Sequence, residues 1–413
     1  NTCALEKIRS NSFLLKLNAV HFGTNYLWIS FESLILPLEL EAVTGNSSPG
    51  LLLGIIAFIT ISIGVMASLF AGVLSDGFSI MWGKRGPYII IGSIITIIAV
   101  ALDILPYPSI LMVFVAFLFI QVGSNISSGA YQPLFRDLVT EGQRGKATGI
   151  NGFYTLAGTA GGLGLTGYLV SAGRMNLSLL VIAGILIFTA LMTAITIKKE
   201  DRPIVNANFH PIRTFLSIFD PGQKVPRFFW LVGASFLFFL GISGLSFFEL
   251  YYFKDVLHSS DPSALVAISG IFVLVFAAAG AVVFGIISDR YGRLRILLAS
   301  TIVAGIATAL IPAFSTFINF IILGSFIGAS YGIYFSVSKA LASDLSPKED
   351  AGKYMAYYNI SVGGSSAFST LFFGLLLDSF GTSFKLGFTA IFEMSAAFYF
   401  LGLILLFEFS RHE

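Results

Sequence analysis

Two acidic residues, Glu32 and Glu249, stand in long apolar stretches of the sequence. A carboxylate among apolar neighbours is costly to ionise, so it could take up a proton from one compartment and release it into another. His21 precedes Glu32 on the same stretch. We therefore predict proton coupling at these three residues. In the alternative interpretation, either glutamate only accepts a hydrogen bond from a ligand hydroxyl, or pairs with His21 or Lys339.

Polar side chains recur at helical spacing around Glu32. Asn25, Trp28 and Glu32 follow steps of three and four residues, which place them on one face of a helix. Amides, carboxylates and aromatic rings suit a polyol, because its hydroxyls need donors and acceptors and its ring faces can lie on an aromatic side chain. The predicted substrate-binding residues are Asn25, Trp28, Glu32, Gln121, Asn125, Asn151, Tyr154, Glu249, Tyr331 and Tyr358. The alternative is hydrogen bonding between helices, which contributes about 0.6 kcal/mol on average in membranes.

The elements that carry these residues must lie in a lipid bilayer. The 413 residues are 56% hydrophobic and 11% charged, whereas soluble domains carry about 25% charged residues. A formal net charge of +2 is too even to indicate a nucleic-acid partner. No His/Cys cluster at metal spacing, phosphate-binding glycine loop or nucleophile and base pair stands out. We therefore expect neither an enzyme nor a bound cofactor or metal.

Apolar stretches of helix length recur twelve times along the chain. A bilayer crossing needs about 20 apolar residues, and a helix satisfies its backbone polar groups within each segment. The predicted spans are 13–40, 50–75, 87–106, 109–135, 147–172, 177–197, 227–253, 263–288, 294–312, 315–342, 353–378 and 384–409. This pattern predicts an all-α integral membrane protein with twelve transmembrane helices in two pseudo-symmetric six-helix bundles.

The basic residues indicate how these spans are oriented. If the first residues lie in the cytoplasm, most of the 24 Lys and Arg face that side, and only Arg174, Lys254 and Lys385 face the other. Loops that remain in the cytoplasm carry such an excess of positive charge. We therefore expect a multi-pass protein of the cell membrane with both termini in the cytoplasm.

A polar connection punctuated by prolines occupies residues 198–226. It predicts a linker between an N-terminal bundle at 1–197 and a C-terminal bundle at 227–413. Short motifs recur in the same order on both sides of it, and Gly72–Asp76 shares the pattern Gly-x-x-Ser-Asp with Gly285–Asp289. Two parallel halves are expected of a carrier that rocks about a central site between its repeats.

Charged residues cluster after the second and eighth spans and at the ends of the fourth and tenth. They are Asp76, Lys84, Arg85, Asp137, Asp289, Arg290, Arg293 and Asp344. A carboxylate at a helix end can cap amide groups and pair with arginine. We predict a cytoplasmic gate that latches the two halves together, because a partly wet ion pair contributes only about 0–1 kcal/mol and can be broken. The alternative is that these charges only fix the topology.

The two loops resemble the signature of the major facilitator superfamily, a glycine and an aspartate followed by a turn rich in glycine and arginine. The second loop has the usual spacing in Asp289, Gly292 and Arg293, and the first is a longer version that runs from Asp76 to Arg85. The resemblance implies two six-helix bundles that give alternating access to a central cavity.

The longer first loop closes on Gly86-Pro87-Tyr88 and is similar to that of the sucrose-type and glycoside transporters. Asn125 and Gly129 fall at the spacing of a motif of that group. The departures from that motif are Ser128, Ala130 and Gln132. The resemblance implies a monomer that carries a sugar or glycoside with protons. Two alternatives stay open: an exporter or uniporter of a drug-like or anionic solute on the same fold, and a membrane sensor that does not transport.

Overall fold

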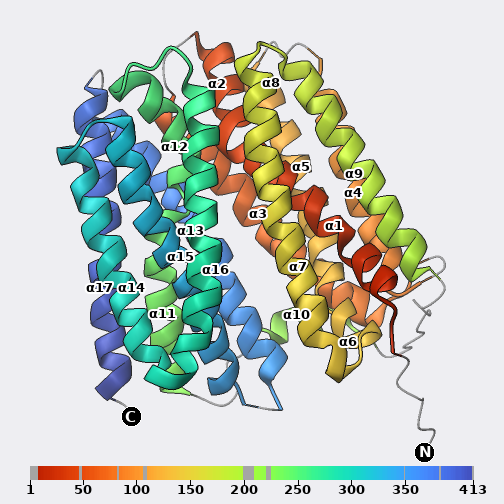
Figure 1. The fold of residues 1–413 in the computed structure, drawn as a ribbon. Helices are drawn as coiled ribbons and strands as arrows, with labels where there is room; N and C mark the ends of the chain where they lie inside the picture. The colour runs from red at the N-terminus through yellow and green to blue at the C-terminus, as the bar shows by residue number, and fades with distance from the viewer. Residues whose placement is uncertain are drawn as a thin grey trace, which may run out of the picture. The chain divides into compact units, whose positions relative to one another are not determined.

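The structure is a computed structural model, and it describes residues 8–45, 49–80, 83–105, 109–198, 209–219, 225–347, 349–380 and 383–411. The named elements in these residues are all helical, apart from an isolated bridge between Ile80 and Gly83 (Figure 1). The prediction of an all-α protein is therefore confirmed.

Each predicted span of the first half coincides with a helix, or with helices that follow one another without a break. These are α1 (Asn11–Ser30) with α2 (Leu36–Thr44), α3 (Gly50–Gly77), α4 (Gly86–Leu102), α5 (Ile110–Tyr131), α7 (Glu141–Gly161) with α8 (Gly167–Ser171), and α9 (Met175–Ile197). Two short helices lie outside the spans, α6 (Leu134–Leu138) and α10 (Pro211–Ser217).

The second half follows the same scheme, except that a short turn separates the two helices of the seventh span. Its helices are α11 (Pro226–Ile242) with α12 (Leu245–Tyr251), α13 (Pro262–Tyr291), α14 (Arg293–Leu310), α15 (Phe317–Leu345), α16 (Ala351–Ser379) and α17 (Phe384–Arg411). In the described part of the chain, nine helices are long and apolar enough to cross a membrane, and α4 is a shorter apolar helix. The helices of the first and fifth predicted spans carry the polar stripes, which lowers their mean hydropathy.

Three of the spans contain a π-helical turn. These turns are Phe31–Ile35 between α1 and α2, Gly162–Thr166 between α7 and α8, and Tyr252–Val256 after α12. A π turn accommodates an extra residue within a helix and is frequent at functional sites. The side chains beyond each turn therefore point in different directions from those that an uninterrupted α-helix would give.

The chain divides into two compact units. The first comprises residues 1–31, 63–169 and 173–220, and the second comprises 32–62, 170–172 and 221–413. The change at 220 falls within the predicted linker at 198–226. Residues 32–62 and 170–172 belong to the predicted N-terminal bundle but group with the second unit. The division into two six-helix bundles stays a prediction.

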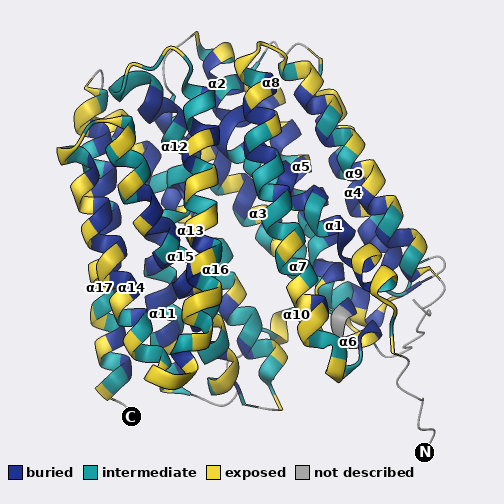
Figure 2. Ribbon diagram, viewed as in Figure 1, coloured by how far each residue is buried: buried dark blue, intermediate teal, exposed yellow. Residues whose placement is uncertain are grey.

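Each unit has its own apolar core (Figure 2). The core of the first unit includes Leu17, Ile89 and Tyr131. That of the second is rich in aromatic rings, and Phe238 stacks on Tyr334 with ring centroids 3.8 Å apart. By contrast, the most apolar part of α13 has only 11% of its residues buried. The large exposed part of this apolar helix is suited to face lipid.

Close helix crossings recur in both units. A Cβ atom on Gly129 of α5 would overlap the Ser68 carbonyl oxygen of α3, and one on Gly332 of α15 would overlap the Ala277 carbonyl oxygen of α13. Small residues let helix backbones approach in this way. The fourth and tenth spans thus pack against the second and eighth spans in equivalent ways.

Candidate functional site

Two hydrogen bonds engage the polar stripe of α1, one to α5 and one within the helix. Trp28 Nε1 donates to Ser124 Oγ of α5 over 3.1 Å, and Asn25 Nδ2 donates to the His21 carbonyl oxygen over 2.8 Å. Both side chains are half-buried. Their remaining surface is open to further contacts, so the hydrogen bonds between helices leave room for a ligand.

The predicted residues of α5 form one local network. Asn125 Nδ2 donates to the carbonyl oxygen of Gln121 over 2.9 Å and to its Oε1 over 3.1 Å. Gln121 is buried, whereas Asn125 is half-buried. Asn125 is therefore the more accessible of the two amides.

Tyr131 joins the polar residues of α1, α5 and α7, and the sequence interpretation did not select it. Its ring meets that of His21 edge-on with centroids 4.4 Å apart, and its hydroxyl lies within hydrogen-bond reach of Asn151. The hydroxyl also donates to Asn18 Oδ1 over 2.9 Å. Its position three residues after Ser128, on the polar stripe, is the signal that could have revealed it.

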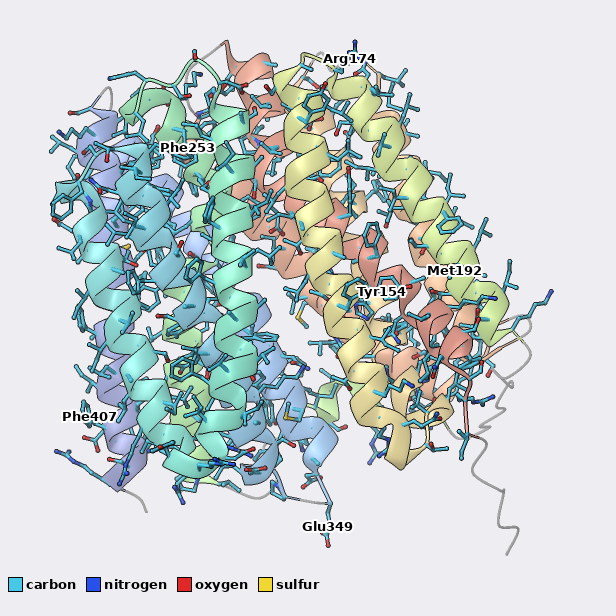
Figure 3. All side chains as sticks on the ribbon, viewed as in Figure 1. Tyr154, Arg174, Met192, Phe253, Glu349 and Phe407 are labelled. Atoms are coloured by element: carbon cyan, nitrogen blue, oxygen red, sulfur yellow. The ribbon has the colours of Figure 1, made fainter. Side chains whose placement is uncertain are left out.

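Tyr154 completes the predicted residues of the first unit (Figure 3). It is half-buried on α7, and its ring packs edge-on against Phe22 with centroids 6.5 Å apart. Asn151 is thus joined to His21 of α1 through Tyr131, and Tyr154 contacts α1 through Phe22.

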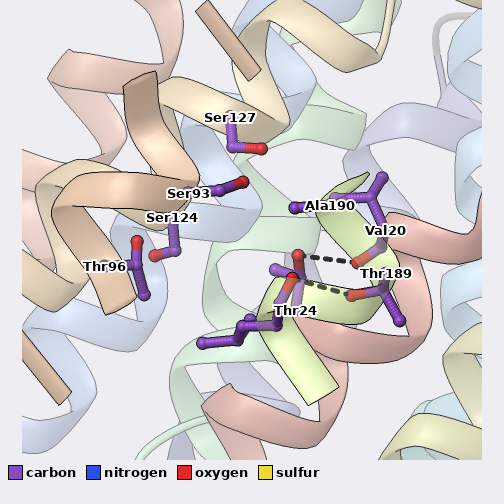
Figure 4. A pocket seen from close by; sticks show the side chains of 9 residues that line it. Val20, Thr24, Ser93, Thr96, Ser124, Ser127, Thr189 and Ala190 are labelled. Atoms are coloured by element: carbon purple, nitrogen blue, oxygen red, sulfur yellow. Dashed lines mark hydrogen bonds between the residues drawn. The ribbon is translucent and has the colours of Figure 1, made fainter. Parts of the chain in front are cut away.

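A small hydroxyl-lined space lies in the first unit next to Ser124, the partner of Trp28 (Figure 4). Its volume is about 10 Å³, and its hydroxyls come from Thr24, Ser93, Thr96, Ser124, Ser127 and Thr189. A space of this size and polarity suits one water molecule and is too small for an organic solute. This space borders Ser124, which holds Trp28, and it is distinct from the polar side chains of Asn25, Asn125 and Tyr154, none of which lines it.

In the second unit, Glu32 and Tyr331 come together. Glu32 lies on the π turn Phe31–Ile35, is half-buried, and interacts electrostatically with Tyr331. Tyr331 is also half-buried and packs edge-on against Phe239 with centroids 5.9 Å apart. Within the described residues, no hydrogen bond or ion pair engages the Glu32 carboxylate, so it remains available to a proton or a ligand.

Tyr358 lies in a different environment from Tyr331. Only 1% of its surface is exposed, and its hydroxyl shares a 2.8 Å hydrogen bond with Ser338. The ring belongs to the core of the second unit. This placement favours a packing role over direct ligand contact.

Glu249 is also separated from Glu32. Its Oε1 accepts a 2.5 Å hydrogen bond from Ser269 of α13, and the residue borders a cavity that Glu32 does not line. Glu249 also lies beyond a break in the seventh span, because α11 ends at Ile242 and α12 begins at Leu245. Regular spacing across such a break does not predict a shared face.

The predicted gate residues of the first half form an ion-pair cluster centred on Arg85. Its Nε donates to Asp137 over 2.6 Å, an NH2 group donates to Asp76 over 2.6 Å, and NH1 donates to Ser75 Oγ over 3.1 Å. Lys84 adds longer contacts of 3.8 Å to Asp76 and 3.6 Å to Asp137. Only 2% of the Arg85 side chain is exposed.

The second half repeats this arrangement around Arg293. The guanidinium pairs with Asp344 and with Asp289, the latter over 3.3 Å, and 25% of the arginine side chain is exposed. Arg290 is exposed and forms no ion pair with a described residue. These pairs each lie within one half, so a latch between the halves stays a prediction. Among the described residues, no group of three His, Cys, Asp or Glu is arranged to hold a metal ion.

A polar cluster in the second unit was not predicted from the sequence. Lys254 Nζ lies 2.8 Å from Glu41 Oε1, and the Tyr251 hydroxyl donates to the Pro37 carbonyl oxygen over 2.9 Å. The cluster joins α2 to α12 and its π turn. Lys254 is one of the few basic residues predicted on the outer side, and this exception was the available signal.

Comparisons with known proteins identify the family. A family model described as Major Facilitator Superfamily matches residues 19–282 and 257–413. The chain belongs to the major facilitator superfamily. No curated protein matches it significantly.

Solved structures of major facilitator proteins share the fold of this chain. A mutant of the nucleoside transporter NupG is 13% identical with a TM-score of 0.73, covering 97% of this chain and 99% of that chain. A mutant of the peptide transporter POT is 15% identical with a TM-score of 0.75, covering 98% and 96%. A bacterial homologue of the human lysosomal transporter Spinster is 16% identical with a TM-score of 0.66, covering 96% and 97%.

Membership in the major facilitator superfamily fixes the general activity. Its members are membrane transporters that bind small-molecule substrates, so this protein is a multi-pass membrane protein of the secondary transporter class. The predicted recognition of the superfamily is confirmed.

Proposed function

We propose that this major facilitator protein carries a sugar or glycoside across the cell membrane together with protons, by alternating access. The observation that supports this is the group of half-buried polar and aromatic side chains on α1, α5 and α7. Asn25, Asn125 and Asn151 supply amide donors and acceptors, and Trp28 and Tyr154 supply ring faces. Sugars need both kinds of contact.

Glu32 is the proposed proton carrier. Its carboxylate is partly exposed, lies near Tyr331, and lacks an ion-pair partner among the described residues. A carboxylate inside a membrane is costly to keep charged, so it exchanges a proton when its surroundings change. His21 and Glu249 stay predicted contributors to proton movement. The protein works as a monomer, with both termini in the cytoplasm.

Transport in reconstituted vesicles tests this proposal. Counterflow measured with a panel of sugars and glycosides should identify the substrate, and a proton gradient should drive its accumulation. Glu32→Gln should retain counterflow. Its accumulation of substrate in a proton gradient should be at least 10-fold lower than that of the wild type. Glu349→Gln, a matched change at an exposed carboxylate in the loop after α15, should behave as the wild type (Figure 3).

The panel should also contain nucleosides and dipeptides, because solved structures of a nucleoside and a peptide transporter share this fold. Counterflow of one of these solutes without any sugar would replace the sugar assignment. Equal accumulation by the wild type and Glu32→Gln would exclude Glu32 as the proton carrier. Saturable binding without counterflow of any solute would favour a sensor.

A further inference from the structure

A second, chemically different cavity lies inside the second unit. Its volume is about 140 Å³, and its walls include residues of α12, α13, α15 and α17. Six of its lining residues carry the argument: Phe248, Glu249, Tyr252, Phe320, Phe388 and Phe392. An engineered cavity of about 150 Å³ holds benzene, so this space fits a ligand of only four to six heavy atoms. It is too small for a glycoside.

Aromatic rings form one wall of this cavity. Tyr252 is at the centre of the group, with ring centroids 5.3 Å from Phe320, 5.3 Å from Phe388 and 5.4 Å from Phe392. The faces of such rings attract cations through their quadrupoles. The wall can therefore bind either an apolar ligand or an organic cation.

Glu249 distinguishes these two ligand classes. It is the one carboxylate among the lining residues, and Tyr252 is the one other titratable group there. The described residues give the carboxylate a hydrogen bond from Ser269 and no ion pair. An ionised carboxylate in apolar surroundings is stabilised when a cation pairs with it. A neutral ligand would leave that group unpaired, so the cavity favours a cation.

The cavity lies near the ends of its helices. Phe320 and Phe388 fall within the first two turns of α15 and α17, which begin at Phe317 and Phe384. These ends are predicted to face the outer side of the membrane. A charged ligand could enter there without crossing the middle of the bilayer.

We propose that this cavity binds a small organic ammonium ion, with Glu249 as its counter-ion and the rings around Tyr252 as its walls. The site is separate from the polar side chains assigned to the sugar, since none of them except Glu249 lines it. It goes beyond the proposed transport activity, and binding can be measured whether or not a sugar is carried.

A matched pair of probes tests this inference on the purified full-length protein. Tert-butylammonium and tert-butanol have nearly the same shape and differ in charge. At constant ionic strength, tert-butylammonium should bind saturably by calorimetry and at least 10-fold more tightly than tert-butanol. Glu249→Gln keeps the size and the hydrogen bond from Ser269, and it should weaken ammonium binding at least 10-fold without changing the binding of tert-butanol.

Two further variants examine the aromatic wall, and they remain informative if Glu249→Gln does not fold. Tyr252→Leu should weaken ammonium binding about 5-fold, whereas Tyr252→Phe should retain it because the ring is kept. Glu349→Gln should bind as the wild type does. Equal binding of the two probes would show an apolar cavity only and would overturn the inference. Ammonium binding that survives in Glu249→Gln, or the absence of saturable binding, would overturn it as well.

Discussion

The clusters around Arg85 and Arg293 use the same residue types in the two halves of the chain, but they differ in burial. In each, one arginine pairs with an aspartate at the end of the second or eighth span and with another at the end of the fourth or tenth. The exposed fraction of the arginine side chain is 2% in the first half and 25% in the second. The repeated motif thus preserves which residues pair, but the strength of these ion pairs can differ between the two halves.

The two arginines also differ in their partners. In the first half, Arg85 reaches Ser75 as well as the two aspartates. In the second half, Gly292 adopts a φ of 91° and α14 begins at once with Arg293, which leaves the guanidinium near the surface. The hydroxyl of Ser288, the counterpart of Ser75, donates to the Gly285 carbonyl oxygen, and no hydrogen bond links it to Arg293 among the described residues.

The largest expected effect comes from removing the buried arginine. Arg85→Met should lower the free energy of unfolding by about 2 kcal/mol, because the arginine loses charge-assisted hydrogen bonds to Asp76 and Asp137, whose half-exposed carboxylates water can then solvate. Arg293→Met should cost at most about 1 kcal/mol, as exposed pairs do. Chemical unfolding of both variants in the same detergent measures the difference. Equal losses would show that burial does not distinguish the clusters.

Replacing the glycine at a helix crossing should cause the same loss of stability in the two halves. Gly129→Ala and Gly332→Ala should each destabilise by about 1–3 kcal/mol, because the added Cβ meets a backbone carbonyl that cannot easily move. Gly149→Ala and Gly352→Ala are matched controls, since a Cβ at either position has no neighbour within 4 Å. Thermal unfolding of the four variants should separate the two pairs. A loss confined to one half would contradict equivalent packing.

Salt should affect the two clusters differently. Screening weakens interactions between exposed charges more than between buried ones. The stability difference between wild type and Arg293→Met should therefore shrink toward zero as the salt concentration rises to about 1 M. The corresponding difference for Arg85→Met should persist. The unfolding measurements repeated at low and high salt test this, and a parallel decline in both would argue against burial as the cause.

The smallest effect is expected at Lys84. Its contacts with Asp76 and Asp137 are longer than those of Arg85. Lys84→Met should cost about 0.5 kcal/mol or less, as partly exposed pairs do. A larger loss would mean that the lysine, and not the arginine alone, holds the cluster together. The same unfolding assay resolves the two outcomes when Arg85→Met is measured beside it.

The sequence predicted the fold well because the bilayer imposes simple rules on it. Apolar length located the helices, and the repeated Gly-x-x-Ser-Asp motif located Asp76 and Asp289 at equivalent helix ends. The motif could not show how deeply Arg85 would be buried, since that depends on the path of the longer loop. Burial is a property of packing, which spacing alone does not encode.

Side-chain placement was predicted less well. Helical spacing selected Asn25 and Trp28, which are half-buried on α1 as a ligand-binding role requires. Glu249 was grouped with Glu32 because both stand in apolar stretches, which does not show whether two carboxylates border the same cavity. The reasoning from spacing also treated Tyr358 as accessible, although periodicity cannot tell a polar surface from a hydroxyl bonded inside a core. The pair of Glu41 and Lys254 involves residues far apart in the sequence, and no local pattern predicts it.

The π turn at Phe31–Ile35 has a consequence for the first span. One extra residue in a helix rotates every later side chain by about 100° around the helix axis, while the helix itself continues. Trp28, before the turn, contacts Ser124 of the first unit. Pro37 and Glu41, after the turn, contact Tyr251 and Lys254 of the second unit. Deleting a single residue from the turn would rotate both Pro37 and Glu41 away from their partners, Tyr251 and Lys254. The π turn therefore changes the direction of the side chains at the point where the chain passes from the first unit to the second.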